Sequence, residues 1–240
     1  MAWYFWLIIV VIAFGIGIPA GIFIDKLGIK MYYKRLTGSA SGGASIAQRA
    51  LKFDKDNLQL KQADVVFVGD SITEGYNLET YFPNKNYVNR GISGDKSGGV
   101  LNRINSNVIA LAPKKIVLLI GTNDMHDNIS ATQVFENTKA TILEICSNLP
   151  QCVVFVEGIY PINENMDGYS RGLELNKKFC QVNANLAALA NGKNIIYIDT
   201  YNALLDKTNN LTPAYTRDGL HLLPAGYDVV TKLLTKALDK

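Results

Sequence analysis

The chain has 240 residues, of which 48% are hydrophobic and 19% are charged, and its formal net charge is +3. This length suits one domain of ordinary size, and so small a net charge does not suit a nucleic-acid-binding surface. The cysteines Cys146, Cys152 and Cys180 have neither CxxC nor metal-type spacing, so they indicate no metal site. Cys146 and Cys152 would form a disulfide only if the domain is exported.

The first predicted element is a membrane-spanning helix over residues 3–24. This run has no charged side chain, and its 22 residues would form a helix about 33 Å long, close to the roughly 30 Å hydrocarbon core of a bilayer. Aromatic residues flank the run, as is common at membrane interfaces: Trp3, Tyr4, Trp6, Tyr32 and Tyr33.

Two other interpretations of this run are weaker. A cleaved signal peptide normally begins with basic residues and has a shorter apolar core, whereas no Lys or Arg precedes residue 3. A buried core helix would have polar flanking positions, which the run does not have. We therefore predict an uncleaved, single-pass anchor within residues 1–35.

Basic residues dominate the segment after the run. Residues 25–56 carry a net charge of +4, so the chain beyond them sums to −1. Such a segment suits anionic lipid head groups, and the positive-inside tendency would keep the rest of the chain in the cytoplasm. Residues 36–45 are rich in Gly, Ser and Ala and are predicted to be a flexible tether.

Residues 46–240 are predicted to form one domain in which strands and helices alternate. A first helix is expected over residues 46–62. The predicted strands are the short apolar runs 63–69, 86–91, 115–121, 152–158 and 194–200. The other predicted helices cover residues 97–111, 130–148, 169–191 and 224–238. This alternation is typical of an α/β fold with a parallel sheet between two layers of helices.

Residues suited to nucleophilic catalysis follow three of the predicted strands and precede the last predicted helix. Ser71 comes directly after the first strand in "GDS", Gly91 ends the second in "NRGISGD", and Asn123 follows the third in "GTND". Asp218 and His221 lie in "DGLH", just before the last helix. A serine nucleophile needs a base, a group that orients the base and donors for the oxyanion, and these five residues can supply that set.

Together, these blocks closely resemble the SGNH (GDSL-type) hydrolases, a family of esterases and lipases, over about residues 63–230. The form of the Gly91 block is most similar to the platelet-activating-factor acetylhydrolase-like branch. The resemblance implies a flavodoxin-like α/β/α sandwich with three layers, whose five-stranded parallel sheet has the strand order 2-1-3-4-5. It also implies hydrolysis of acyl esters without a metal or a cofactor.

The chemistry and the resemblance together assign the roles. Ser71 is predicted to attack the ester carbonyl, His221 to act as the base, and Asp218 to fix the tautomer of His221. The predicted oxyanion hole combines the backbone N–H groups of Ser71 and Gly91 with the side-chain amide of Asn123. Each residue also has a purely structural alternative as a helix cap or a turn former.

Four further features accompany these blocks. His126 is the alternative base, but the DGLH context favours His221. Asp70 and Asp124 are expected to hold loops through hydrogen bonds. The polar segment 158–172 is expected either to face the substrate or to be a solvated connection.

The sequence thus predicts a membrane-anchored serine esterase that acts on a small acyl ester, such as a lysophospholipid. The alternatives are a carbohydrate O-acetyl esterase of the same family and, in a different class, a non-catalytic tethered binding domain. The side of the membrane stays open, because related enzymes are often exported whereas the charge bias favours the cytoplasm.

Overall fold

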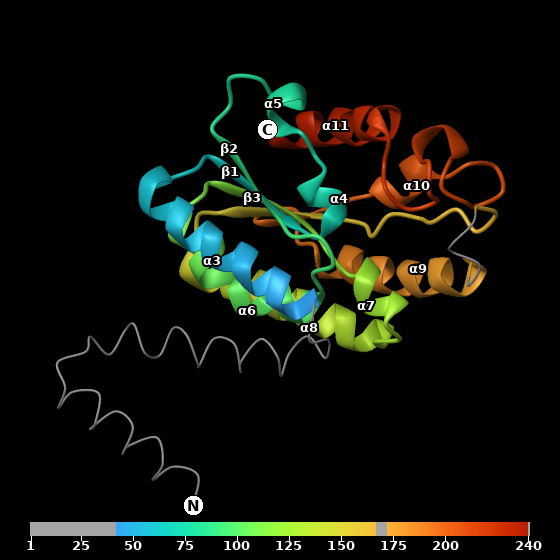
Figure 1. Cartoon of the computed structure of the whole chain (residues 1–240), viewed down its shortest axis with the longest axis horizontal. Helices are drawn as coiled ribbons and strands as arrows, with labels where there is room; N and C mark the ends of the chain where they lie inside the picture. The colour runs from blue at the N-terminus through green and yellow to red at the C-terminus, as the bar shows by residue number, and fades with distance from the viewer. Residues whose placement is uncertain (1–41, 167–171, 240) are drawn as a thin grey trace, which may run out of the picture. The chain divides into compact units, whose positions relative to one another are not determined.

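Figure 1 shows a computed structural model of the chain, which describes residues 42–166 and 172–239. The predicted anchor in residues 1–35, including the span over residues 3–24, lies outside the described residues. Within the described part of the chain, no helix has the length and apolar character needed to cross a bilayer.

Helix α3 (Gly42–Leu60) begins earlier than expected, so residues 42–45 are helical although we predicted them to be tether. Extending an existing helix is much easier than nucleating one, and this extension occurs although Gly42 and Gly43 are poor helix formers. The chain divides into two compact units, Met1–Arg49 and Ala50–Lys240, and the second unit contains the whole sheet.

The sheet has five parallel strands in the order β2-β1-β3-β4-β5, which confirms the predicted topology. The strands are β1 (Val65–Gly69), β2 (Tyr87–Gly91), β3 (Lys115–Leu119), β4 (Val153–Glu157) and β5 (Ile195–Ile198). Gly69 is in register with Gly91 on one side and with Leu119 on the other. The carboxyl ends of β1, β2 and β3 are therefore level, and the loops that follow them meet at one edge of the sheet.

Helices cover both faces of this sheet (Figure 1). One face carries α3, α6 (Ser97–Asn107), α8 (Ala131–Asn148) and α9 (Gly172–Leu189). The other carries α4 (Ser71–Glu74), α5 (Leu78–Tyr81) and α11 (Pro224–Leu238). The short helices α7 (Thr122–His126) and α10 (Thr200–Leu204) follow β3 and β5. The three-layer α/β/α arrangement is as predicted.

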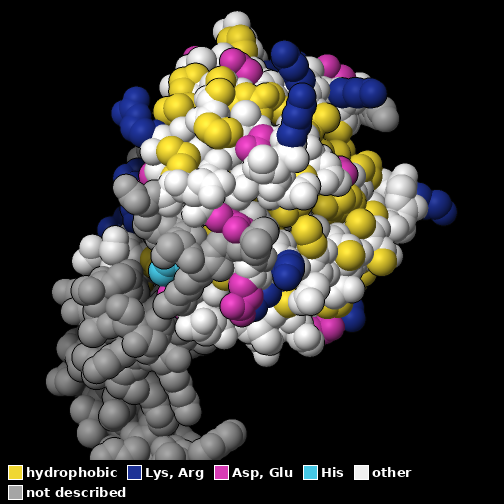
Figure 2. Space-filling view, turned by 90° about the vertical axis from the view of Figure 1, so that its right-hand side faces the viewer, with side chains coloured by type: hydrophobic (Ala, Val, Ile, Leu, Met, Phe, Trp, Pro, Cys, Tyr) yellow, Lys and Arg dark blue, Asp and Glu magenta, His cyan; other side chains and the backbone are white. Residues whose placement is uncertain are grey.

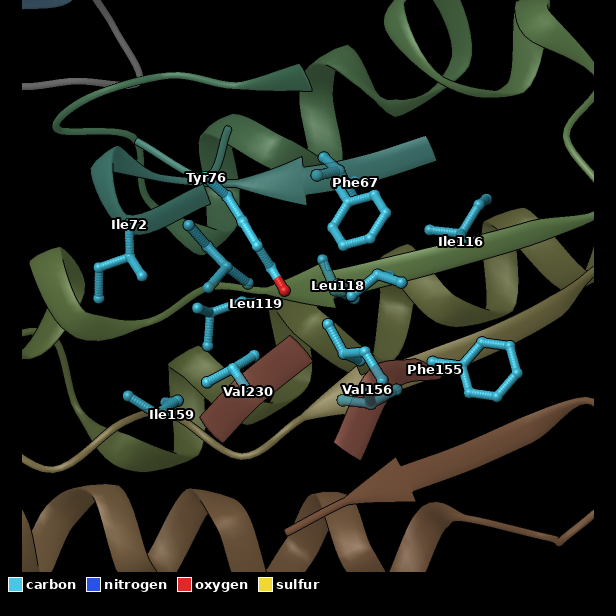
Figure 3. Packing of buried hydrophobic residues seen from close by; sticks show 14 of the residues in the cluster. Phe67, Ile72, Tyr76, Ile116, Leu118, Leu119, Phe155, Val156, Ile159 and Val230 are labelled. Carbon is cyan, nitrogen blue, oxygen red and sulfur yellow. The ribbon is translucent and has the colours of Figure 1, made fainter. Parts of the chain in front are cut away.

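The strands at the centre of the sheet are buried on both faces. All five residues of β1 are buried, which is why its sequence is continuously apolar rather than alternating. Figure 3 shows Phe67, Leu118 and Val156, from three neighbouring strands, packed together with Val230 of α11. This apolar layer fixes the strands that carry the site residues at their ends.

Several predicted elements end one to four residues earlier than expected, and in two of them the structure shows the reason. Strand β3 stops at Leu119 because Gly121, two residues on, has a φ of +129°, a conformation that a strand residue does not adopt. The helix predicted over 97–111 is divided at Val108 into α6 and a short 3₁₀ helix, Ile109–Leu111.

Candidate active site

Ser71 is the first residue of α4 and lies directly beyond the carboxyl end of β1. Asp70 caps this helix, because its carboxylate accepts a hydrogen bond from the Ile72 backbone N–H at 3.0 Å. A Cβ atom at Gly69 would lie 2.2 Å from the Leu119 carbonyl oxygen, so only glycine lets the chain turn here so close to β3. Sequence and packing together therefore place the Ser71 hydroxyl at the edge of the sheet.

The structure brings Ser71, His221 and Asp218 together as predicted. The Oγ of Ser71 is 2.9 Å from Nε2 of His221, and Nδ1 of the same ring is 2.6 Å from Oδ2 of Asp218. With Nδ1–H donating to the carboxylate, Nε2 is left as an acceptor for the serine proton. The arrangement can therefore remove a proton from the hydroxyl of Ser71 and stabilise the imidazolium that forms.

Asp218 is held in place by its own loop. Its Oδ1 accepts hydrogen bonds from the backbone N–H groups of Leu220 and His221 at 2.9 and 2.8 Å. Partial burial raises the pKa of Asp218, but the His221 ring and these two N–H groups outweigh it and lower the pKa to about 2. Asp218 is consequently ionised at neutral pH, as the orienting group must be.

The side chains of the candidate base and its orienting carboxylate are accessible to solvent. The side chains of Asp218 and His221 are 47% and 46% exposed. Figure 2 views the molecule from the side to which the strand ends point, and histidine side-chain atoms reach the surface there.

The predicted oxyanion donors differ in whether their N–H groups are already bound within the protein. Asn123, the second residue of α7, donates one amide N–H to the Asp95 carbonyl at 3.0 Å, which orients the amide and leaves its other N–H for a ligand. The Ser71 N–H, at the first position of α4, has no acceptor within its own helix.

The N–H of Gly91 instead donates to Oδ1 of Asn89 at 2.8 Å. A Cβ at Gly91 would lie 2.2 Å from the Glu74 backbone nitrogen, so this glycine is needed for the close packing of β2 against α4. The part that Gly91 takes in the oxyanion hole stays a prediction, and Asn89 is a residue that the sequence did not single out.

The structure gives His126 a different place from His221. His126 ends α7 with its side chain 55% exposed, and its Nδ1 lies 3.5 Å from Oδ1 of Asp127. It is Nε2 of His221 that accepts the hydrogen bond from the Ser71 hydroxyl. This geometry supports the predicted choice of base.

Asp70 and Asp124 hold loops, as expected. Asp124 accepts hydrogen bonds from both the backbone N–H and the hydroxyl of Ser97, at 2.9 and 2.5 Å, and so joins α7 to α6. Burial is the largest influence on the pKa of Asp70 and raises it to about 7, although the Ile72 N–H opposes this.

A buried ion pair beside these carboxylates escaped the sequence analysis. Arg103 of α6 donates to Asp95 at 2.7 Å and to the carbonyl of Gly69 at 3.1 Å, and both side chains are essentially inaccessible to solvent. The available signal was the position of Arg103 on the same face of α6 as Val100 and Ile104, because a charged residue on an apolar face needs a partner.

A small pocket opens next to Asn123. One wall is polar and comes from α7, and the other is apolar; the lining residues are Thr122, Asn123, His126, Ile162, Leu175, Phe179 and Leu220. Its volume is about 100 Å³. Ile162 belongs to the segment 158–172, which we expected either to face the substrate or to be a solvated connection, and Leu220 directly precedes His221. Among the described residues, no group of three or more His, Cys, Asp or Glu could hold a metal ion.

The chain has a parallel sheet with a hydrogen-bonded serine, histidine and aspartate at its carboxyl edge. This arrangement is typical of the serine hydrolases. Within this class, residues 67–229 match the GDSL-like lipase/acylhydrolase family, and the chain belongs to that family. The predicted family is thereby confirmed, and the protein is an ester-hydrolysing enzyme.

Several solved structures are similar to the chain. One is a protein from Streptococcus pneumonia, provisionally assigned as a platelet activating factor (27% identity, TM-score 0.73, 92% of this chain and 100% of that one). An acylhydrolase from Bacteroides fragilis, also provisionally assigned, is 30% identical with a TM-score of 0.71, over 79% and 95% of the two chains. A GDSL-like lipase from Bacteroides thetaiotaomicron is 27% identical with a TM-score of 0.70, over 79% and 97%. No curated relative was found to match the chain.

Proposed function

We propose that the protein is a membrane-anchored serine esterase that cleaves short acyl esters, with Ser71 as nucleophile. The observation that carries this proposal is the continuous set of contacts from Ser71 Oγ through His221 to Asp218, at 2.9 and 2.6 Å. Membership of a family of lipases and acylhydrolases favours catalysis over the alternative of a tethered binding domain.

The reaction has two halves that use the same groups. Ser71 Oγ attacks the ester carbonyl while Nε2 of His221 takes the serine proton, and Asp218 stabilises the imidazolium. The C–O bond to the alcohol then breaks, and the proton passes from His221 to the leaving alkoxide. Water, deprotonated by His221, attacks the acyl-enzyme and releases the carboxylic acid together with free Ser71.

The free N–H of Asn123 and the N–H of Ser71 are the donors that we assign to the oxyanion. Both lie at the edge of the sheet beside the nucleophile, and the orientation of the Asn123 amide is already fixed by Asp95. Such preorganised donors stabilise the tetrahedral intermediate without any reorganisation during the reaction.

The pocket beside Asn123 supports a short acyl group. A cavity of about 150 Å³ holds a benzene ring, so a pocket of about 100 Å³ has room for about four carbons. Its apolar wall, formed by Ile162, Leu175, Phe179 and Leu220, suits the hydrocarbon part of an acetyl to butyryl group. We therefore assign the acyl group to this pocket, whereas the alcohol of the proposed substrate can be a lysophospholipid or an acetylated sugar.

The anchor is a proposal that rests on the sequence of residues 3–24 and on the basic segment that follows them. A tethered active site open to solvent would meet esters presented at the membrane surface. The excess of basic residues after the predicted span favours a cytoplasmic domain, whereas the frequent export of related enzymes favours an exported one.

One experiment tests the nucleophile and the anchor together. Cells expressing the full-length chain are treated with a fluorophosphonate probe and separated into membrane and soluble fractions. We expect the probe to label this chain in the membrane fraction, and Ser71→Ala to abolish both labelling and turnover of p-nitrophenyl acetate. Labelling that persists in the Ser71→Ala variant would contradict the assigned nucleophile. Labelled protein in the soluble fraction would contradict the anchor and leave the nucleophile standing.

A further inference from the structure

The two halves of the catalytic pair come from distant parts of the chain. Ser71 and His221 are 150 residues apart, one on α4 and the other on the loop before α11. Their 2.9 Å contact therefore depends on how α4 and α11 are held against each other. A misplacement of about 1 Å can cost a hundredfold in rate, so this alignment bears directly on catalysis.

Helix α4 depends on its neighbours for its position. It has four residues, far fewer than an isolated helix needs for stability. Asp70 caps its start, and Nδ2 of Asn89 donates to the carbonyl of Thr73 at 2.6 Å. These contacts fix the two ends of α4, and neither of them reaches α11.

Tyr227 makes the connection to α11. Its hydroxyl donates a hydrogen bond to the backbone carbonyl of Ile72 at 2.7 Å. Ile72 is the residue after the nucleophile, and Tyr227 lies on the first turn of α11, six residues after His221. A Cβ at Gly75 would lie 2.9 Å from the Tyr227 hydroxyl, so the chain after α4 is also shaped around this group.

The surroundings of Tyr227 leave it little freedom. The residue is 7% exposed, and its ring lies 4.8 Å from that of Tyr76 and 5.9 Å from that of Tyr81. The Tyr227 carbonyl accepts a hydrogen bond from the hydroxyl of Thr231 at 2.7 Å. The packed ring keeps the Tyr227 hydroxyl at a fixed position relative to α11, which it needs if it sets a distance between two helices.

We infer that Tyr227 is a positioning residue, whose hydroxyl sets the distance between the nucleophile helix and the segment that carries His221. This inference rests on the proposed function of Ser71 and His221. It adds a residue that touches neither the substrate nor the catalytic side chains and acts through the backbone of Ile72.

The same tyrosine cluster supplies a matched control. Tyr76 is 4% exposed, and its hydroxyl is 2.6 Å from that of Thr231, one helical turn further along α11. Figure 3 shows this hydroxyl directed away from the sheet edge, toward the part of α11 that contains Val230. Tyr76→Phe and Tyr227→Phe each remove one buried hydroxyl from the cluster, but only Tyr227→Phe removes the bond to Ile72.

The test compares both variants with the parent in the full-length chain, using p-nitrophenyl acetate turnover and the rate of labelling by a fluorophosphonate. For Tyr227→Phe we expect kcat and the labelling rate to fall about 10- to 100-fold with KM changed less than about twofold. For Tyr76→Phe we expect a similar loss of Tm and a kcat within about twofold of the parent. The final extent of labelling counts folded molecules, so a folding defect is measured separately from a slower reaction.

The double variant Tyr227→Phe/His221→Ala tests whether Tyr227 acts through His221. If Tyr227 acts by aligning His221, then Tyr227→Phe should cost no further activity in a His221→Ala background, because there is no base left to align. Parental kcat in Tyr227→Phe, an equal loss in Tyr76→Phe, or additive losses with His221→Ala would each overturn the inference. A parent chain that is not labelled at Ser71 would instead overturn the proposed function.

Discussion

Asp218 contacts His221 and Asp70 directly precedes Ser71, and the pKa values of these two carboxyl groups are shifted in opposite directions. Asp218 is half exposed, and its pKa is lowered to about 2. Asp70 is 1% exposed, and burial raises its pKa to about 7. Burial is the main cause of the raised pKa of Asp70, and the smaller number of hydrogen-bond donors around Asp70 leaves that effect less opposed than in Asp218. Asp218 accepts from the His221 ring and from two backbone N–H groups, whereas Asp70 accepts from the Ile72 N–H and its Oδ2 has no partner in the described structure.

The two carboxyl groups therefore suit different roles, an electrostatic one for Asp218 and a structural one for Asp70. The loop around Asp218 keeps a full negative charge next to His221, where an imidazolium must form during the reaction. The buried Asp70 needs only one accepting oxygen to cap α4, so it does its work whether or not it carries a proton. A carboxylate close to the nucleophile is therefore not by itself evidence of a catalytic role.

Replacing each of these two aspartates with asparagine should change kcat by very different amounts. We expect Asp218→Asn to lower kcat by about 10⁴, because the amide stabilises the wrong imidazole tautomer and cannot balance the imidazolium. We expect Asp70→Asn to lower kcat less than about tenfold, since the amide oxygen can still cap α4. The measurement is kcat on p-nitrophenyl acetate at pH 7.5 for both variants. Comparable losses in the two would show that Asp70 has a part in the chemistry.

The next prediction places a new carboxylate in the oxyanion hole. Asn123→Asp removes an amide donor and puts negative charge where the oxyanion develops, so kcat should fall by at least about 10² to 10³ with little change in KM. Asn123→Ala is the control, because it removes the donor without adding repulsion. Asp should therefore be no better than Ala. An Asp variant with near-parental kcat would mean that Asn123 only shapes the turn after β3.

The strands were predictable because their signals are local, and the candidate Ser71, His221 and Asp218 were predictable because each lies in a short motif that resembles the family. Continuous apolar runs identify buried parallel strands, and Asp218 and His221 are three residues apart within one short motif. The family resemblance then supplied the strand order, which the apolar runs alone do not determine.

Contacts between distant segments could not be predicted in the same way. Arg103 reaches Gly69 across 34 residues, and Tyr227 reaches Ile72 across 155. Neither residue has a local pattern that names its partner, since the partner in both cases is a backbone carbonyl, which every residue possesses. The donation from Gly91 to Asn89 likewise depends on a side-chain rotamer rather than on sequence spacing. The sequence therefore predicted which side chains meet at the candidate site, but not the contacts of Arg103 and Tyr227 that support it.

Glu157 is another buried carboxyl group, and we expect its charge to affect the free energy of unfolding rather than the rate of the reaction. This is the smallest effect that we predict. Glu157 ends β4, is 4% exposed, and accepts a hydrogen bond from the Tyr160 hydroxyl at 2.6 Å. Burial raises its pKa to about 7, although the Tyr160 hydrogen bond opposes this. In the unfolded chain the pKa of a glutamate is about 4.3. Between about pH 4.3 and 7 the folded state thus holds a proton that the unfolded state has lost, and the free energy of unfolding falls as the pH rises, by up to about 1.4 kcal/mol per pH unit.

Replacing Glu157 with glutamine should remove this dependence, because the amide is neutral at every pH and its oxygen can still accept from Tyr160. Urea unfolding of the parent and of Glu157→Gln at several pH values between 4.5 and 7.5 measures the difference. The variant should gain stability relative to the parent as the pH rises, with unchanged m-values. Asp70 contributes the same slope to both proteins and cancels in the difference. Asp218 has a depressed pKa, so its stabilising contribution is lost only as the pH falls from about 4 towards 2, below this window. Parallel stability curves for parent and variant would show that Glu157 is already ionised in the folded protein, and that burial at the end of β4 does not control its charge.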